Sequence, residues 1–129
     1  MERLLNIGFK YAGKWVLHDN ELDFELENPS NKINILYTFV INTKVMYIGK
    51  SNRTLYDRMY NYKKNELSQS TNYKNSKRIK ENILNGKVVE IYAFIDNGLL
   101  SYGDFKINLS AGLEDSLINL IQPEWNILK

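Results

Sequence analysis

The chain has 129 residues, of which 43% are hydrophobic and 25% charged, the composition of a soluble globular domain. It has no cysteine and one histidine, His18, which excludes a disulfide framework, a thiolate nucleophile and a zinc site built from cysteines or several histidines. No segment approaches the roughly 20 apolar residues of a membrane-spanning helix, and the first residues lack the apolar core of a signal peptide. We therefore expect a cytoplasmic protein without a membrane partner.

The net charge of +2 is unevenly distributed along the chain. Residues 44–87 contain 11 lysines and arginines but 3 acidic residues, whereas residues 1–31 and 88–129 are both net acidic. A basic segment between two acidic ones suits a polyanion bound on one face. A solvated surface patch explains the same charges equally well.

The first part of the chain predicts two β-hairpins. Residues 7–17 and 21–27 partly alternate between apolar and polar side chains and predict a hairpin that turns at His18-Asp19-Asn20. A loop at residues 28–31 follows. Residues 33–41 and 44–50 are rich in Val, Ile, Tyr and Phe and predict a second, central hairpin.

Two helices and a further strand are predicted next. Apolar residues on a helical spacing indicate helices over residues 54–64 and 72–85, the second of which ends at Gly86. The polar residues 65–71 between them predict a loop, and residues 88–95 predict a third strand of the central sheet.

The remainder predicts an irregular segment and a last helix. Residues 96–109 leave room for one short strand, Ser110 is a candidate cap, and Pro123 ends the helix. The order of elements indicates an α/β (α+β) sandwich in which helices flank a small central sheet.

Two charged residues occupy helical positions that are predicted to face the core. Glu114 lies one turn back along the apolar stripe of the last helix, and Arg58 lies within the stripe of the first predicted helix. A buried charge is costly unless another group pairs with it. The ordinary alternatives are a glutamate favoured by the helix dipole and an arginine whose charged end reaches solvent.

The central hairpin contributes two tyrosines. A three-residue loop at 42–44 would place Tyr37 opposite Gly49 and would put Tyr37 and Tyr47 on one face, whereas a two-residue loop would put them on opposite faces. A glycine in a strand often marks the close approach of a ligand or backbone, but a single tyrosine is usually an ordinary half-buried strand residue. An acid, an arginine and two phenols together match what phosphoryl transfer needs: a cation ligand, a fixed positive charge and a group that orients water.

The same residues belong to a series of short motifs that resembles the GIY-YIG nuclease family. The motifs are Leu36-Tyr37, Tyr47-Ile48-Gly49-Lys50-Ser51, Leu55-x-x-Arg58, Leu113-Glu114-x-x-Leu117-Ile118 and Pro123-x-Trp125-Asn126. They span residues 33–129, and the length and layout are most similar to the small phage endonucleases of that family. The sequence departs from the family pattern at Ile35-Leu36-Tyr37, which lacks a glycine, and at Tyr62, where many members have histidine.

The resemblance implies a role for each matched residue. Tyr37 would hold or deprotonate the attacking water, and Tyr47 would support that water or the scissile phosphate. Arg58 would bind the phosphate, Glu114 would be the single protein ligand of Mg²⁺ or Mn²⁺, and Asn126 would steady the site. The implied activity is metal-dependent endonucleolytic cleavage of DNA, in host-DNA degradation or restriction. Residues 1–31 would be an N-terminal β-hairpin extension of a nuclease domain at 32–129.

Double-stranded DNA is the expected partner. The candidate nucleic-acid-binding residues are Lys50, Tyr62, Lys63, Lys64, Lys74, Lys77 and Arg78. A catalytically silent DNA-binding module and an RNA-cleaving toxin or defence effector are the alternative functions. Cleavage of both strands would require a homo-oligomer or successive nicking, because each active site cuts one strand.

Overall fold

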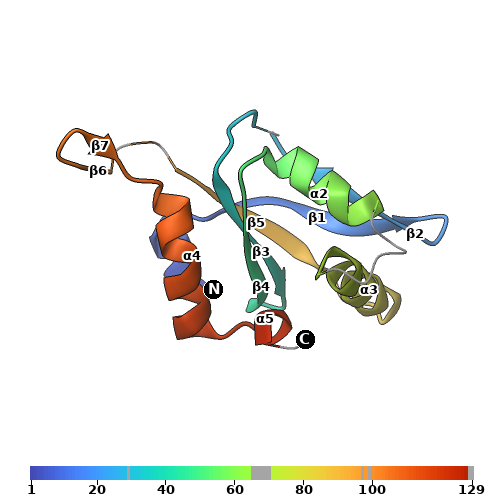
Figure 1. The fold of residues 1–129 in the computed structure, drawn as a ribbon. Helices are drawn as coiled ribbons and strands as arrows, with labels where there is room; N and C mark the ends of the chain where they lie inside the picture. The colour runs from blue at the N-terminus through green and yellow to red at the C-terminus, as the bar shows by residue number, and fades with distance from the viewer. Residues whose placement is uncertain (29, 65–70, 97, 99, 128–129) are drawn as a thin grey trace.

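The computed structural model describes residues 1–28, 30–64, 71–96, 98 and 100–127. They form an α+β fold in which helices lie on both sides of a twisted sheet, as the sequence predicts (Figure 1). In chain order the elements are α1 (Glu2–Asn6), β1 (Lys10–His18), β2 (Glu21–Leu26), β3 (Ile35–Ile41), β4 (Lys44–Ser51), α2 (Leu55–Lys64), α3 (Thr71–Leu84), β5 (Glu90–Ile95), β6 (Ser101–Tyr102), β7 (Phe105–Lys106), α4 (Leu109–Ile121) and α5 (Glu124–Ile127).

The sheet has five strands in the order β2-β1-β5-β3-β4, and every neighbouring pair is antiparallel. All seven residues of β3 are buried, because it has a strand on each side and a helical layer on each face. This explains its nearly continuous run of apolar residues. β4 is an edge strand, so groups from helices on either face can meet beside it.

Two hydrophobic cores lie on opposite faces of the sheet. Helices α2 and α3 cover one face, and α4 and α1 cover the other (Figure 1). Successive residues of a strand point to opposite faces, so Tyr37 of β3 packs in the α2/α3 core and Leu36 packs beneath α4. The α2/α3 core includes Trp15, Phe39, Met59, Tyr62, Ile79 and Ile91.

The central hairpin has the turn of one loop alternative and the strand register of the other. Its turn is the two-residue type, because Ile41 pairs with Lys44 and both turn residues, Asn42 and Thr43, have positive φ angles. Of the two loop lengths that the sequence left open, the structure therefore has the two-residue one. A bulge with Met46 as the extra residue then shifts the register of β4.

The bulge has a direct consequence for the site. Beyond it, Phe39 pairs with Tyr47 and Tyr37 pairs with Gly49. This is the register expected from the longer loop, so Tyr37 and Tyr47 point to the same face despite the short turn.

The N-terminal hairpin is confirmed, with its turn at Asp19-Asn20, but it is preceded by the unpredicted helix α1. Because β1 also pairs with β5, this hairpin belongs to the same sheet as β3 and β4. The division into an extension at 1–31 and a nuclease domain at 32–129 stays a prediction. The loop predicted at 65–71 lies outside the described residues except for Thr71, which begins α3.

The last helix begins slightly earlier than predicted. Its cap is Asn108, whose side chain accepts a hydrogen bond from the N–H of Ala111 at 3.1 Å, so the expected cap at Ser110 is wrong. The Ser110 hydroxyl instead donates to the carbonyl of Asn34 at 2.8 Å. Asparagine and serine both cap helices well. Here Asn108 is the cap, because the Ser110 hydroxyl is bonded to Asn34. The segment before this helix forms the small β6–β7 hairpin rather than one short strand.

Within the described part of the chain, no helix combines the length and apolar character needed to cross a bilayer.

Candidate active site

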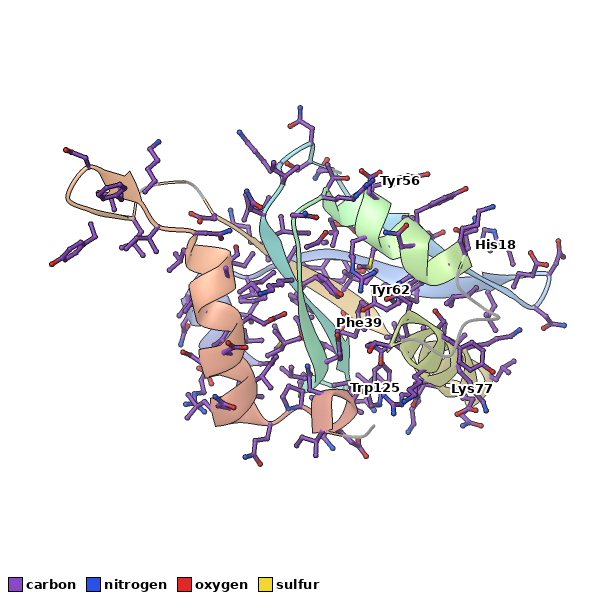
Figure 2. All side chains as sticks on the ribbon, viewed as in Figure 1. His18, Phe39, Tyr56, Tyr62, Lys77 and Trp125 are labelled. Carbon is purple, nitrogen blue, oxygen red and sulfur yellow. The ribbon has the colours of Figure 1, made fainter. Side chains whose placement is uncertain are left out.

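A cluster of buried phenols surrounds Arg58 between α2 and the sheet. The hydroxyl oxygens of Tyr37 and Tyr62 lie 2.7 Å apart, and Arg58 donates from Nε to Tyr37 at 3.1 Å and from Nη2 to Tyr62 at 3.3 Å. Arg58 and Tyr62 are four residues apart in α2, which places them on the same side of the helix. Figure 2 shows Tyr62 close to Phe39 beneath α2, in agreement with the 5.4 Å between their ring centroids.

A third element also holds the guanidinium of Arg58. Its Nη2 donates to Oδ1 of Asn72, in the first turn of α3, at 2.8 Å. The guanidinium carbon also lies 4.4 Å from the centre of the Tyr62 ring, within cation–π range. Contacts from β3, α2 and α3 therefore orient Arg58, which is not simply extended into solvent.

Gly49 permits the close packing of the two tyrosines of the hairpin. A Cβ atom at this position would lie 2.5 Å from the hydroxyl oxygen of Tyr37 and 2.9 Å from Cε2 of Tyr47. The glycine gap in the strand is thus filled by the side chain of Tyr37, whereas the sequence pattern suggested the approach of a ligand or backbone.

The phenols of the cluster are neutral at physiological pH. Burial raises the pKa of Tyr37, Tyr47 and Tyr62 well above the usual value near 10, and the positive charge of Arg58 only partly opposes this. Burial lowers the pKa of Arg58, but the phenols of Tyr37 and Tyr62 more than compensate, so the guanidinium stays charged.

This geometry does not support the expected role of Tyr37 as the group that holds or deprotonates water. Its side chain is 1% exposed, and its hydroxyl is engaged by Tyr62 and Arg58. Tyr47 is only partly buried and is therefore the more accessible phenol of the hairpin. Tyr37 is placed to support Arg58.

Glu114 of α4 approaches the strand β4 from the face of the sheet opposite to α2 and α3. Its side chain is 16% exposed, and its Oε1 lies 3.8 Å from Nζ of Lys50, at the end of β4. Burial raises the pKa of the carboxyl group, while the ammonium and backbone N–H of Lys50 lower it. Glu114 also raises the pKa of Tyr47 through its negative charge, which places it within electrostatic reach of the phenol cluster. The core-facing position predicted for this acid is confirmed.

Asn126 of α5 holds the backbone of β4 in place at Ile48. Its Oδ1 accepts from the N–H of Ile48, and its Nδ2 donates to the carbonyl of Ile48, both at 2.9 Å. The amide thereby satisfies backbone groups on the open edge of the sheet as a further strand would. Ile48 lies between Tyr47 and Gly49, so this contact holds the strand that carries them.

The candidate nucleic-acid-binding residues are not equivalent in the structure. The expectation for Tyr62 is wrong, because its side chain is fully buried and its hydroxyl belongs to the Arg58 cluster. Lys63 pairs with Asp23 at 3.3 Å, and Arg78 donates from Nη1 to the carbonyl of Trp125 at 3.3 Å, so both have contacts within the protein. Lys50 contacts Glu114.

The other candidate cations lie on the surface. Lys64, Lys74 and Lys77 are exposed, and Figure 2 shows Lys77 on the outer side of α3. They remain predicted contacts of a polyanion.

Two residues of the site were not identified from the sequence. Asn72 is separated from Arg58 by 14 positions, and no local pattern connects them. Arg53 lies beside Lys50 and Arg58 in a cleft of about 530 Å³. Its position in the basic segment, two residues after the Tyr47–Ser51 motif, was a signal that pointed to it.

The residues present fit a magnesium-type ion. No cluster of three or more acidic or histidine side chains occurs in the described part of the chain. A single half-buried carboxylate suits a hard cation that keeps most of its water ligands, as Mg²⁺ does. The amine of Lys50 would have to share Glu114 with the ion or move away from it.

Solved structures similar to this chain include two endonucleases. The chain is 26% identical to bacteriophage T4 EndoII, solved as a glutamate-to-alanine mutant; the match covers 98% of this chain and 97% of that one with a TM-score of 0.77. It is 19% identical to the restriction endonuclease HPY188I, solved in complex with product DNA; that match covers 94% of this chain and 78% of that one with a TM-score of 0.58. No protein-family model and no curated protein sequence matches the chain. The chain therefore has the fold of these endonucleases, and its predicted resemblance to a phage endonuclease II is confirmed.

Proposed function

We propose that this protein is a metal-dependent endonuclease of the GIY-YIG family that hydrolyses phosphodiester bonds in double-stranded DNA. One observation carries the proposal: Arg58, fixed by Tyr37 and Tyr62, lines one cleft with Lys50 of β4, and Lys50 also contacts the half-buried Glu114 of the opposite layer. The similarity to T4 EndoII supports an endonuclease, and the product DNA bound by HPY188I supports DNA as the substrate.

Arg58 supplies a charge of fixed direction for the substrate phosphate. Because Tyr37, Tyr62 and Asn72 already hold its planar group, little conformational freedom is lost when a phosphate binds. The guanidinium would hydrogen-bond the non-bridging oxygens and stabilise the negative charge that builds up on them during attack.

Glu114 supplies the protein ligand for a divalent cation. When bound, Mg²⁺ or Mn²⁺ would provide a positive charge at the phosphate and lower the pKa of a coordinated water. Before binding, the ammonium of Lys50 opposes the rise in the pKa of the Glu114 carboxyl group that its burial causes.

Tyr47 is the phenol best placed to orient the attacking water. It is more accessible than Tyr37 and lies within electrostatic reach of Glu114. Its raised pKa keeps it protonated, so it would direct the water by hydrogen bonding without removing the proton.

The decisive experiment compares Glu114→Gln with the neighbouring, exposed Asp115→Asn. Both substitutions remove one negative charge from α4, but only the first removes the proposed metal ligand. We expect Glu114→Gln to reduce the Mg²⁺-dependent nicking of supercoiled plasmid by roughly 10²- to 10³-fold or more, while DNA binding, measured by fluorescence anisotropy, persists. Asp115→Asn should cleave like the unaltered protein.

Cleavage by Glu114→Gln at the unaltered rate would overturn the proposal. A parallel digest of total RNA tests the substrate, since cutting of RNA but not of DNA would identify an RNA-cleaving effector. Failure of the unaltered protein to cut either polymer, together with retained DNA binding, would identify a silent DNA-binding module.

A further inference from the structure

The cleft that contains Arg58 extends away from the phenol cluster. It has a volume of about 530 Å³ and lies between the end of β4, the start of α2 and the first turn of α4. Its polar lining includes Lys50, Arg53, Arg58, Asn61 and Asn108. A cavity of this size accommodates more than the single phosphate that Arg58 would bind.

The charged side chains that line the cleft are all positive among the described residues. Three of the residues that line it are cationic, and among the described residues of its lining none is acidic. Its remaining polar groups include the side chains of Ser51 and Asn61, which can donate hydrogen bonds to phosphate oxygens. This combination selects for an anion with several oxygen acceptors.

The cleft is continuous with the candidate active site. Lys50 lines it and also contacts Glu114 at 3.8 Å, and Arg58 lines it and also contacts Tyr37. Ala111, at the edge of the cleft, precedes Glu114 by three residues and so lies on the same side of α4. A nucleic-acid strand whose scissile phosphate reaches Arg58 and Glu114 would therefore pass through the cleft.

Arg53 lies in the cleft with its backbone held in place. Its N–H donates to the hydroxyl of Ser51 at 3.0 Å, a short-range turn that ends β4 and directs the chain into α2. The side chain is exposed, and none of the described acidic residues forms an ion pair with it. Its guanidinium is thus available to a ligand.

We propose that this cleft binds the backbone phosphate that flanks the scissile one, and that Arg53 is its principal cationic contact. The inference rests on the proposed function, because it assumes that the substrate is a nucleic acid. Lys50 and the Asn61 side chain complete the binding site. Arg53 takes no part in bond cleavage; it sets the position of the strand relative to Arg58 and Glu114.

The test uses Glu114→Gln protein, so that DNA is bound without being cut. In this background Arg53→Gln is compared with Lys87→Gln, which removes the same charge from an exposed residue beyond the end of α3 and outside the cleft. Affinity for a DNA duplex is measured by fluorescence anisotropy at several salt concentrations. We expect Arg53→Gln to weaken binding and to reduce the slope of log affinity against log salt by about 1. Lys87→Gln should leave the slope nearly unchanged, and Arg53→Lys should largely restore it.

A second measurement identifies the phosphate. Once the cleavage position has been mapped, a neutral methylphosphonate is placed at one linkage at a time on either side of it. We expect one flanking position to weaken binding with Arg53 present and to have little further effect in Arg53→Gln. Equal salt slopes for Arg53→Gln and Lys87→Gln, or additive losses at every linkage, would overturn the inference.

The two proposals fail in different ways. If Glu114→Gln stops cleavage but Arg53→Gln behaves like Lys87→Gln, the nuclease assignment stands and the cleft proposal is wrong. If Glu114→Gln cleaves normally, the proposed function itself is wrong. In protein that retains Glu114, Arg53→Gln should raise KM several-fold with little change in kcat, because the reacting groups are intact.

Discussion

Arg58 receives contacts from one residue of its own helix, Tyr62, and from two residues of other elements, Tyr37 and Asn72. Tyr37 and Tyr62 accept from its guanidinium and bond to each other, and Asn72 accepts from the same nitrogen as Tyr62. The hydroxyl of Tyr62 is thus a buried support for the arginine. Its raised pKa makes it a stable neutral partner of the charged guanidinium.

Replacement of Tyr62 by phenylalanine tests this support. The change removes a hydroxyl that is bonded to both Tyr37 and Arg58 without altering the ring that packs in the core. We expect the free energy of unfolding in urea to fall by about 1 kcal/mol. Loss of one anchor of Arg58 should slow cleavage by up to roughly 10²-fold.

Tyr60→Phe is the matched control, since Tyr60 is 39% exposed on the same helix and stacks on Tyr56. If the two variants have the same stability and the same cleavage rate, the Tyr62 hydroxyl does not support Arg58.

At the scale of elements, the short helix α5 closes the open edge of β4. Trp125 packs into the α2/α3 core, and the Asn126 amide bonds both backbone groups of Ile48. A four-residue helix has little stability of its own, so these contacts hold it in place and protect the edge strand at the same time. The strand they support carries Tyr47 and Gly49.

Asn126→Ala should therefore loosen β4. It leaves one donor and one acceptor of the strand without their protein partner, and we expect a loss of about 1–3 kcal/mol in the free energy of unfolding. Asn126→Asp keeps the acceptor for the Ile48 N–H but turns a carboxylate oxygen toward the Ile48 carbonyl, so its loss should be at least as large as that of Asn126→Ala. Urea denaturation measures all three proteins.

Asn119→Ala, at an exposed position of α4, is the control for the loss of an asparagine side chain. Hydrogen exchange of the Ile48 amide gives a local readout, which should accelerate in Asn126→Ala but not in the control. An unchanged exchange rate would show that the amide does not protect the strand.

At the scale of the whole molecule, the site joins two layers that have separate cores. The arginine and the phenols belong to the α2/α3 layer, whereas Glu114 belongs to α4 on the other face. Both layers pack against the last strand of the sheet, β4, and Lys50 at its end contacts Glu114. The pair formed by Lys50 and Glu114 is therefore a direct electrostatic link between the layers.

This link predicts a pH effect. Burial raises the pKa of Glu114, and Lys50 opposes that rise. A carboxyl group is neutral below its pKa, so Lys50→Met should raise the pKa further and extend the neutral form to higher pH. In the metal-free protein, an NMR titration of the Glu114 carboxyl carbon should show the increase. Because a metal ligand must be ionised, the acidic limb of the cleavage-rate profile should move to higher pH in the variant.

Lys44→Met is the control, since Lys44 pairs at 3.6 Å with the half-exposed Glu124, away from Glu114. Like Lys50→Met, it removes one positive charge, but it should leave the pKa of Glu114 unchanged. Coincident titrations of Glu114 in Lys50→Met and in the unaltered protein would contradict the link.

The sequence alone identified the principal strands, the helices α2, α3 and α4, and the residues Tyr37, Tyr47, Arg58 and Glu114 as a group. These features depend on local patterns: alternation in strands, helical spacing of apolar residues, turn-forming residues and polar groups at core positions. Such patterns determine which side of an element is buried, and this is why the inward position of Glu114 was predicted correctly.

Only the tertiary structure decided how these faces meet. The bulge at Met46 restores the tyrosine register, Asn72 reaches Arg58, β1 pairs with β5, and Tyr62 is sealed in the core. Each of these outcomes depends on packing between segments that are far apart in the sequence or on different elements. No local propensity encodes the free energy of such contacts, so they are determined only when the layers pack together on the sheet.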